Sequence, residues 1–417
     1  MSSMFRRLLL PLLPALLLVG CAHGAATAAR DLAMSQDALW SCRCAATSIA
    51  TGIDGAGGAP KLWVAANNKV FEVSADGEAT EVWSSPRFSR ILRLEAADLD
   101  QDGSDEWVVL LDTGRMRSRV VALRDGVRVL VGKPWNGYLR PLRGPSGELT
   151  LVGQRTGGDR PFLGPVFGVE VAADLSLKSG ASLGLPRDFP LFDFFWLPGV
   201  GEQGARLFSL ESNGLLAERN AVSPTQVLWL SDARFVARPL QVEREYRGML
   251  GDYRDGVVDF APPVVLSGGG DQPDRAYVVS QPPRGPVVVE GFMLPRGGDA
   301  RVLEPAPRGL SELARTPLMG RAVAGVAVWK PEPHEEVGAA LVWTRLSGGV
   351  VAPETRLLLF DLTTGDLVTG FPGPMTVGQP EEASSVESSA TESAVAPGEE
   401  TLPDSGADAA QPAPAAE

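Results

Sequence analysis

Short apolar segments separated by Gly, Pro and Asp recur throughout the middle of the chain, and they constrain its fold more than any other feature. The segments are rich in Val, Leu, Phe and Trp, and no window carries the sustained apolar stripe of an amphipathic helix. The 47 glycines and 34 prolines among 417 residues also disfavour long helices. Residues 37–372 are therefore predicted to form an all-β domain.

A faint internal repeat indicates how these strands are arranged. Corresponding strands of successive copies can be anchored at Trp63, Trp107, Leu149, Leu207, Tyr277 and Leu341. The first two intervals, of 44 and 42 residues, fit a four-stranded blade, and the later intervals of 58, 70 and 64 residues require inserted loops. We predict a β-propeller of six four-stranded blades. The longest interval has room for a seventh blade near Phe235 and Gln241, and an irregular pair of β-sandwiches is the competing architecture.

Two Asp-Gly pairs mark hairpins in the first two copies. Asp76-Gly77 follows the strand-like segment Lys69–Val73, and Asp125-Gly126 follows Val120–Leu123. Asp-Gly favours the tight turns whose twist matches that of antiparallel strands. Both pairs therefore predict a hairpin that follows the anchor strand.

An acidic loop, Asp-Leu-Asp-Gln-Asp-Gly-Ser-Asp-Glu, occupies residues 98–106 between two strand-like segments. Oxygen-bearing side chains stand at its first, third, fifth and ninth positions, and glycine at the sixth permits the tight turn that lets alternate residues converge. Ca²⁺ prefers several oxygen ligands around one point. The loop predicts one structural Ca²⁺, with an acidic, solvated, metal-free turn as the alternative. The expected ligands are the side chains of Asp98, Asp100, Asp102 and Glu106 and the backbone carbonyl of Ser104.

The surroundings of this loop exclude an EF-hand, which needs a bidentate Glu at position twelve, where this chain has Val109. A β-flanked Asp-x-Asp-x-Asp-Gly-x-x-Glu loop resembles the calcium loop of FG-GAP/VCBS repeats, the blade unit of integrin-like β-propellers. The resemblance covers about one blade, and the FG-GAP tetrapeptide is absent because Gly58-Ala59-Pro60 is too short to match. The resemblance implies a calcium ion that stiffens the propeller rim and takes no part in catalysis.

The first residues are typical of a targeting signal. Arg6 and Arg7 precede an apolar run, residues 8–19, that is too short to span a bilayer. Leu18-Val19-Gly20-Cys21 matches the bacterial lipobox, in which the cysteine is lipidated. We therefore predict a lipoprotein signal peptide at residues 1–20, acyl chains on Cys21 and a tether at residues 21–36. An ordinary signal peptide cut after Gly20 or Ala22 is the alternative.

The lipobox resemblance also implies a location. Ala22, rather than Asp, after the lipidated cysteine implies the outer membrane, with the domain on its periplasmic side or at the cell surface. Several acyl chains give stable anchoring, so the membrane is an expected partner.

The C-terminal residues 373–417 are predicted to be a disordered acidic tail. They contain no Lys, Arg or aromatic residue, and they carry nine of the acids. Such a composition cannot bury enough apolar surface to offset the entropy of ordering. Subtracting these nine charges from the net charge of −13 leaves about −4 for the rest of the chain. With no basic stripe, a nucleic-acid partner is not expected.

Few residues outside the acidic loop indicate chemistry. Cys42 and Cys44 are separated by one residue, so free thiols, a strained bridge and an intermolecular bond all remain open. His334 is expected in an exposed turn, and no catalytic motif is present. The aromatic side chains that could line a binding face are expected to be core instead. They are Trp135, Tyr138, Phe194, Phe195 and Trp196.

These observations favour a non-catalytic function. We expect a membrane-tethered platform that binds a protein or a glycan of the cell envelope, with no enzyme activity and one Ca²⁺ as its only cofactor. The alternative is a hydrolase acting on polysaccharide, with carboxylates at the propeller centre. A third class is an assembly factor for outer-membrane proteins. Propellers host many functions, so the fold alone does not decide among them.

Overall fold

A computed structural model describes residues 38–55, 57–157, 161–187, 189–198, 204–235, 240–247, 253–260, 264–269, 272–280, 297–319, 322–330, 337–344 and 354–368. The regular elements in these ranges are β-strands, as predicted, and no described helix is long and apolar enough to cross a membrane. The predicted signal peptide, tether and tail, together with Cys21 and His334, lie outside the described residues.

The described strands form six four-stranded antiparallel sheets, which we number as blades I to VI. Blade I contains β2 (Ala46–Ile53), β3 (Pro60–Ala66), β4 (Lys69–Val73) and β5 (Ala79–Ser84). Blade II contains β6 (Arg90–Ala97), β7 (Glu106–Asp112), β8 (Met116–Arg124) and β9 (Val127–Asn136). Blade III contains β10 (Tyr138–Arg143), β11 (Leu149–Thr156), β12 (Phe162–Val171) and β13 (Leu177–Ser182).

The other three blades follow in chain order. Blade IV contains β14 (Phe194–Leu197), β15 (Arg206–Leu210), β16 (Leu215–Arg219) and β17 (Val227–Arg234). Blade V contains β20 (Val265–Gly269), β21 (Gln272–Ser280), β22 (Asp299–Pro305) and β23 (Leu310–Arg315). Blade VI contains β24 (Ala322–Trp329), β25 (Val337–Thr344), β26 (Glu354–Asp361) and β1 (Trp40–Cys42).

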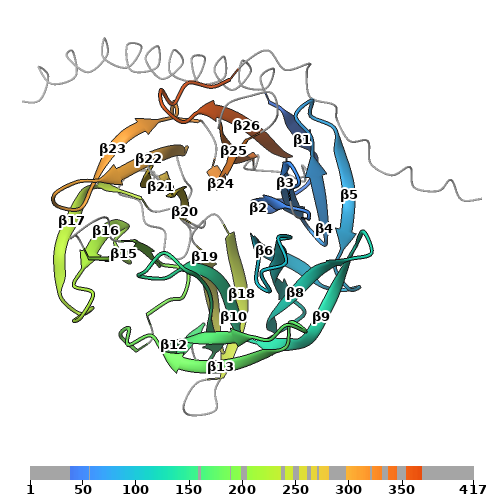
Figure 1. Ribbon diagram of the computed structural model, residues 1–417, viewed down its shortest axis with the longest axis horizontal. Coiled ribbons are helices and arrows are strands. Elements are labelled where there is room, and N and C mark those ends of the chain that lie inside the picture. The colour runs from blue at the N-terminus through green and yellow to red at the C-terminus, as the bar shows by residue number, and fades with distance from the viewer. Residues whose placement is uncertain are drawn as a thin grey trace, which may run out of the picture. The chain divides into compact units, whose positions relative to one another are not determined.

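The six sheets surround a common axis (Figure 1). First strands such as β2, β6 and β24 lie nearest the axis, and fourth strands such as β5, β9 and β17 lie at the rim (Figure 1). A small sheet with two apolar faces is stable only when neighbours cover both, and a ring of blades provides this. The predicted six-bladed propeller is confirmed, and the alternative of paired β-sandwiches is wrong.

The repeat predicted from the sequence matches the blades strand for strand. All six anchors lie on the second strand of a blade: Trp63 on β3, Trp107 on β7, Leu149 on β11, Leu207 on β15, Tyr277 on β21 and Leu341 on β25. The Asp-Gly pairs occupy the turns between third and fourth strands, with Gly77 at φ 85° and Gly126 at φ 76°. These positive φ angles favour glycine, which explains the residue type.

The prediction of a possible seventh blade in the longest interval is wrong. That interval contains a two-stranded antiparallel hairpin, β18 (Leu240–Arg247) and β19 (Tyr253–Phe260), with Leu240 opposite Phe260. Two strands of eight residues account for much of the extra length, and they do not join a four-stranded sheet. Strand propensity correctly marked the segment, but propensity does not reveal how many partners a strand has.

A strand from the start of the domain completes blade VI and closes the ring. β1 pairs with β26, placing Trp40 opposite Leu357 and Cys42 opposite Thr355. The side chain of Trp40 is fully buried. Sequence analysis did not predict this closure, because no local signal links two segments at opposite ends of a domain.

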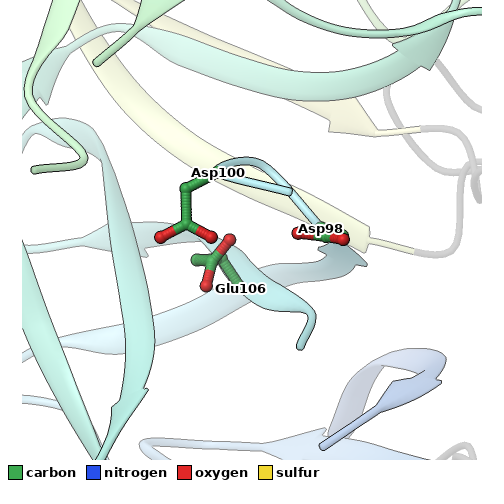
Figure 2. A group of neighbouring side chains, drawn as sticks. All are labelled: Asp98, Asp100 and Glu106. Atoms are coloured by element: carbon green, nitrogen blue, oxygen red, sulfur yellow. The ribbon is translucent and has the colours of Figure 1, made fainter. Parts of the chain in front are cut away.

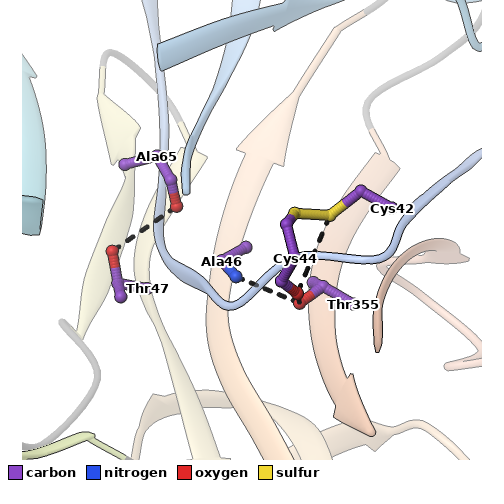
Figure 3. The surroundings of a disulfide bond; sticks show 6 residues. All are labelled: Cys42, Cys44, Ala46, Thr47, Ala65 and Thr355. Carbon is purple, nitrogen blue, oxygen red and sulfur yellow. Dashed lines mark hydrogen bonds between the residues drawn. A yellow bond between two sulfur atoms is a disulfide. The ribbon is translucent and has the colours of Figure 1, made fainter. Parts of the chain in front are cut away.

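A disulfide bond joins Cys42 and Cys44 where the chain leaves β1 for β2 (Figure 3). Of the three cysteine states that the sequence left open, the structure has the intramolecular bridge. The Thr355 hydroxyl donates to the Cys44 carbonyl at 2.8 Å and accepts from the Ala46 N–H at 3.1 Å. The bridged turn is therefore held against blade VI.

The predicted assignment of aromatic residues to the core is largely confirmed. Four of the five side chains are buried in one apolar cluster, and Trp135 is half-buried. The four are Tyr138, Phe194, Phe195 and Trp196.

Candidate metal centre

The acidic loop connects the first two strands of blade II, as the sequence predicted. β6 ends at Ala97 and β7 begins at Glu106, so the loop lies at one end of the blade. Gly103 has φ 85° and Gln101 has φ 62°, which curls the backbone tightly. The tight turn that the sequence predicted at Gly103 is present, and it has the positive φ that favours glycine.

Three of the predicted ligands converge in this curl. Each of Asp98, Asp100 and Glu106 offers one carboxylate oxygen, and these three oxygens lie within 4.8 Å of one another. Figure 2 shows Asp100 and Glu106 with their carboxylates side by side and Asp98 on the adjoining turn. The Glu106 side chain is buried, and the two aspartates are half-buried. Three negative charges therefore share a small, partly desolvated volume.

Backbone hydrogen bonds hold these carboxylates in place. Asp98 accepts from the N–H groups of Asp102 and Gly103, each at 3.1 Å. Glu106 Oε2 accepts from the Leu99 N–H at 2.9 Å. The loop thus fixes two of its three convergent carboxylates through its own backbone, which reduces the reorganisation that a bound ion would require.

The electrostatics of the loop favour a cation. Burial raises the pKa of Glu106 to about 7; the Leu99 hydrogen bond opposes this rise, and the negative charges of Asp100, Asp102 and Asp98 add to it. An opposite charge placed among these groups would favour their ionised forms. The three ionised carboxylates are therefore more stable with a positive ion among them than without one.

Two polar atoms of the loop lack hydrogen bonds to the described residues. They are Asp100 Oδ1 and Ser104 Oγ, and both are buried. Buried polar atoms normally find a partner, so each such atom requires an explanation. A hard cation that takes oxygen ligands would satisfy both atoms, and the side-chain atoms that the loop offers as metal ligands are oxygens. The residues present therefore fit Ca²⁺.

The remaining two predicted ligands take other positions. Asp102 is exposed and stands outside the group of three; its Oδ1 accepts from the Ser104 N–H at 2.8 Å. Ser104 presents a buried hydroxyl, whereas the sequence had suggested its backbone carbonyl as the ligand. Arg124, on β8, places its guanidinium 3.6 Å from Asp100 Oδ2 and 3.9 Å from Asp102 Oδ2.

The loop is also fixed to blade I by residues that sequence analysis missed. The Asp105 N–H donates to the Ile53 carbonyl at 2.8 Å, and Asp105 Oδ2 accepts from the Ile53 N–H at 2.6 Å. Burial raises the pKa of Asp105, and its hydrogen bond from Ile53 opposes the rise. The acidic character of Asp105 was visible in the sequence, but nothing there indicated that it points to another blade.

Arg128 of β9 joins the same interface. It donates to the Asp105 carbonyl at 2.6 Å and pairs with Asp54, the first residue after β2. Its guanidinium lies 4.4 Å from the Trp107 ring centre and 5.2 Å from that of Trp63. A buried, paired arginine that contacts two indoles links blade I, blade II and the acidic loop in one network.

No known protein family matches the chain, and no curated protein matches its sequence. Among solved structures, similarity is found to a protein of unknown function from Bacteroides caccae, at 10% identity over 63% of this chain and 78% of that one, with a TM-score of 0.31. AofleA from Arthrobotrys oligospora is 13% identical over 81% and 89% of the two chains, with a TM-score of 0.41. Sqt1 from Saccharomyces cerevisiae is 10% identical over 81% and 100%, with a TM-score of 0.38. Similarities this distant carry no argument about function.

Proposed function

We propose that this chain is an outer-membrane lipoprotein whose propeller, of the FG-GAP/VCBS type, is stabilised by one Ca²⁺ and serves as a non-catalytic binding platform for a protein or glycan of the cell envelope. The observation that carries the proposal is the convergence of Asp98, Asp100 and Glu106 in a loop between the first two strands of a blade. Lipidation at Cys21 rests on the lipobox sequence alone.

The role assigned to Ca²⁺ is structural. Its ligands would come from one loop that is already bonded to the neighbouring blade through Asp105 and Arg128. A bound ion would neutralise the carboxylates and hold the loop, and hence this interface between blades, in its folded geometry.

An apolar rim strand supports the binding role. β17, the outermost strand of blade IV, begins with the four apolar residues Val227–Leu230, the longest such run among the six outermost strands. Leu228 is 54% exposed and Leu230 is 47% exposed. Outer strands are usually shielded by charge or by shortness, and a strand edge without that shielding can pair with another segment.

The first experiment is a calorimetric titration of Ca²⁺ into a soluble form spanning residues 22–371, together with an Asp98→Asn/Asp100→Asn variant. The proposal expects one site with affinity between about 1 µM and 1 mM that is lost in the variant, and a melting temperature that rises with Ca²⁺ only in the parent protein. Asp54→Asn, in the equivalent connection of blade I, is the matched control and should leave Ca²⁺ binding unchanged. Failure to bind Ca²⁺, or binding that survives in the double variant, would overturn the metal part of the proposal.

The anchoring is tested separately in bacteria that express the full chain. Labelling with a palmitate analogue should mark the wild-type protein and should be lost in Cys21→Ser, which should also leave the membrane fraction. Retention of the Cys21→Ser protein in outer membranes would show that another part of the chain anchors it.

The binding role is tested on the β17 edge. A Leu228→Glu/Leu230→Glu variant should keep its melting temperature and its calcium response, because both side chains are exposed, and should lose contacts that the wild-type protein makes in cross-linked envelopes. Unchanged cross-linking would remove this edge as the binding surface.

A further inference from the structure

An exposed phenylalanine stands in the connection between blades I and II. Residues 85–89 lead from β5 at the rim to β6 near the axis (Figure 1). The Ser89 N–H donates to the Pro86 carbonyl at 3.1 Å, which closes a β-turn with Phe88 at its third position. Phe88 has φ 65° and is 87% exposed. Glycine is the usual residue where a turn requires a positive φ, so the aromatic side chain is held there at a cost in backbone strain.

Hydrogen bonds fix the position of this turn. Ser85 and Ser89 are buried, and the Ser89 hydroxyl donates to the Ser85 hydroxyl at 2.9 Å. The Ser85 N–H donates at 2.7 Å to the carbonyl of Asn68, which lies in the turn between β3 and β4. Phe88 therefore protrudes into solvent from a turn that is bonded to blade I.

Positive charge gathers around this turn, at an end of blades I and II that we call the basic end. Because antiparallel strands alternate in direction, the β5–β6 connection and the β7–β8 turn lie at the end of the blade opposite to the acidic loop. The Arg87 guanidinium lies 4.9 Å from the centre of the Phe88 ring. Ile91, Leu111 and Arg117 form one row across β6, β7 and β8, which places Arg117 at the basic end as well. Six cations of the basic end form no ion pair with a described carboxylate: Arg87, Arg90, Arg115, Arg117, Arg119 and Lys133.

The described acids on the strands that lead into the basic end balance only part of this charge. Glu81 of β5 pairs with Lys69 at 2.6 Å. Asp112, the last residue of β7, lies opposite Arg90, and its Oδ1 accepts from the Gly114 N–H at 3.0 Å. Two acids against seven cations leave this surface positively charged.

Two of these cations also repel each other. Arg117 and Arg119 are half-buried, and Arg119 Nη2 donates to the Gly132 carbonyl at 3.3 Å, next to the exposed Lys133. Burial and, to a smaller extent, the charge of Arg117 lower the pKa of Arg119. Negative charge brought to the basic end from outside would relieve this repulsion.

We propose that the basic end docks onto an anionic lipid surface, with the Phe88 ring between the headgroups and with Arg87, Arg90 and Arg115 beside the headgroup phosphates. A protruding side chain offers a small ligand few contacts, because small-molecule sites are concave. A bilayer can accept a protruding aromatic ring, and anionic headgroups attract the cations around it. This inference goes beyond the proposed function and depends neither on Ca²⁺ nor on lipidation; in an anchored chain it determines which end of the propeller faces the membrane.

The test uses the full chain on vesicles of phosphatidylcholine, alone or with about one-third phosphatidylglycerol. A donor dye is attached through an unnatural side chain at Thr113, which is exposed in the β7–β8 turn, or at Val222, which is 95% exposed in the β16–β17 connection at the opposite end of its blade. Energy transfer to a dye in the bilayer should be greater from Thr113 than from Val222 on the anionic vesicles only, and about 1 M salt should abolish the difference.

Three outcomes would overturn the proposal. Equal transfer from the two positions on anionic vesicles would show that the basic end does not face the lipid. The same difference on pure phosphatidylcholine would show that anionic headgroups are not recognised. Loss of the difference when inorganic phosphate matches the lipid phosphate concentration would assign the cations to a free anion, and binding of poly-glutamate together with equal transfer would assign them to an acidic protein.

Two variants separate the aromatic from the ionic contribution. Phe88→Gly suits the positive φ of the turn, so the melting temperature should not fall, yet the ratio of docked to undocked protein should drop at least about tenfold. Arg115→Gln, at an exposed position, should lower that ratio about fivefold. Lys178→Gln, which changes an exposed cation of β13 in blade III, is the matched control and should leave docking unchanged. Docking that survives in Phe88→Gly would contradict the proposal.

Discussion

Blades I and II use equivalent connections, between their first and second strands, to solve opposite electrostatic problems. In blade I the connection carries Asp54, which pairs with Arg128 and lies 3.2 Å from Lys61 Nζ. In blade II three carboxylates converge, and Arg124, whose side chain is 44% exposed, lies 3.6 Å from Asp100. Acids that the chain neutralises itself need no ion. Acids that it gathers and neutralises only in part would be stabilised by an added cation, which is the role proposed above for Ca²⁺.

The two connections are also coupled, since Arg128 pairs with Asp54 and donates to the Asp105 carbonyl. Arg128 is therefore a physical link between the two connections, and a substitution of this residue can break it. Removing Arg128 should therefore weaken both connections, whereas replacing Asp54 alone should leave Ca²⁺ binding in blade II unchanged.

Replacing the shared arginine should have the largest effect. Arg128→Met removes one of the two cationic partners of Asp54, and the donor to Asp105, from a site where the arginine side chain is 3% exposed. Breaking a buried pair in this way costs roughly 3 to 5 kcal/mol. Urea unfolding should show that loss with little change in the denaturant slope.

A surface ion pair of blade I is the control for Arg128. Lys69→Met breaks the ion pair between Lys69 and Glu81, in which both side chains are 41% exposed. The unfolding free energy of this variant should therefore differ from that of the wild type by less than about 1 kcal/mol. Equal losses in the two variants would show that the buried network does not link the blades.

Calcium itself should have the next largest effect, and only through blade II. At a concentration of one hundred times its dissociation constant, Ca²⁺ should raise the unfolding free energy by about 2.7 kcal/mol. Asp100→Asn should reduce this gain strongly, because it removes one charge and keeps the shape of the side chain. Asp54→Asn should keep the full gain, although its starting stability is lower. A gain that persists in Asp100→Asn would place the ion elsewhere.

The pH dependence of the calcium-free protein gives a third measurement. The pKa of Glu106 is raised from 4.5 to about 7 in the folded protein, so the folded state holds its proton more tightly than the unfolded state. The contribution of Glu106 to stability is therefore highest below about pH 4.5 and falls as the pH rises towards 7, by roughly 2 to 3 kcal/mol. Glu106→Gln should flatten this decline, and saturating Ca²⁺ should do the same. A decline that survives in Glu106→Gln would assign it to other groups.

The sequence predicted the blades well because blade architecture depends on local patterns. Alternating strands, anchor residues such as Trp63 and Trp107, and glycine at the turns are readable one segment at a time. The acidic loop was readable for the same reason, since its convergent carboxylates lie within nine residues. Features that bring distant segments together were not readable, and these include the pairing of β1 with β26, the Asp105 bond to Ile53 and the position of Arg128.

The smallest expected effect concerns Arg124, the exposed cation that faces the acidic loop. Its guanidinium lies 3.6 Å from Asp100 and 3.9 Å from Asp102, so it neutralises part of the charge that Ca²⁺ would otherwise meet. Arg124→Gln should therefore tighten Ca²⁺ binding by roughly two- to fivefold, the range expected for an exposed ion pair, while the stability of the calcium-free protein falls slightly. The tightening should shrink as salt is added, because exposed charges are screened. Weaker Ca²⁺ binding in this variant would mean that Arg124 organises the loop instead of competing with the ion. The acids of blade II would then depend on a cation of the chain itself, as Asp54 does in blade I, and the two connections would differ only in how much of their charge the chain neutralises.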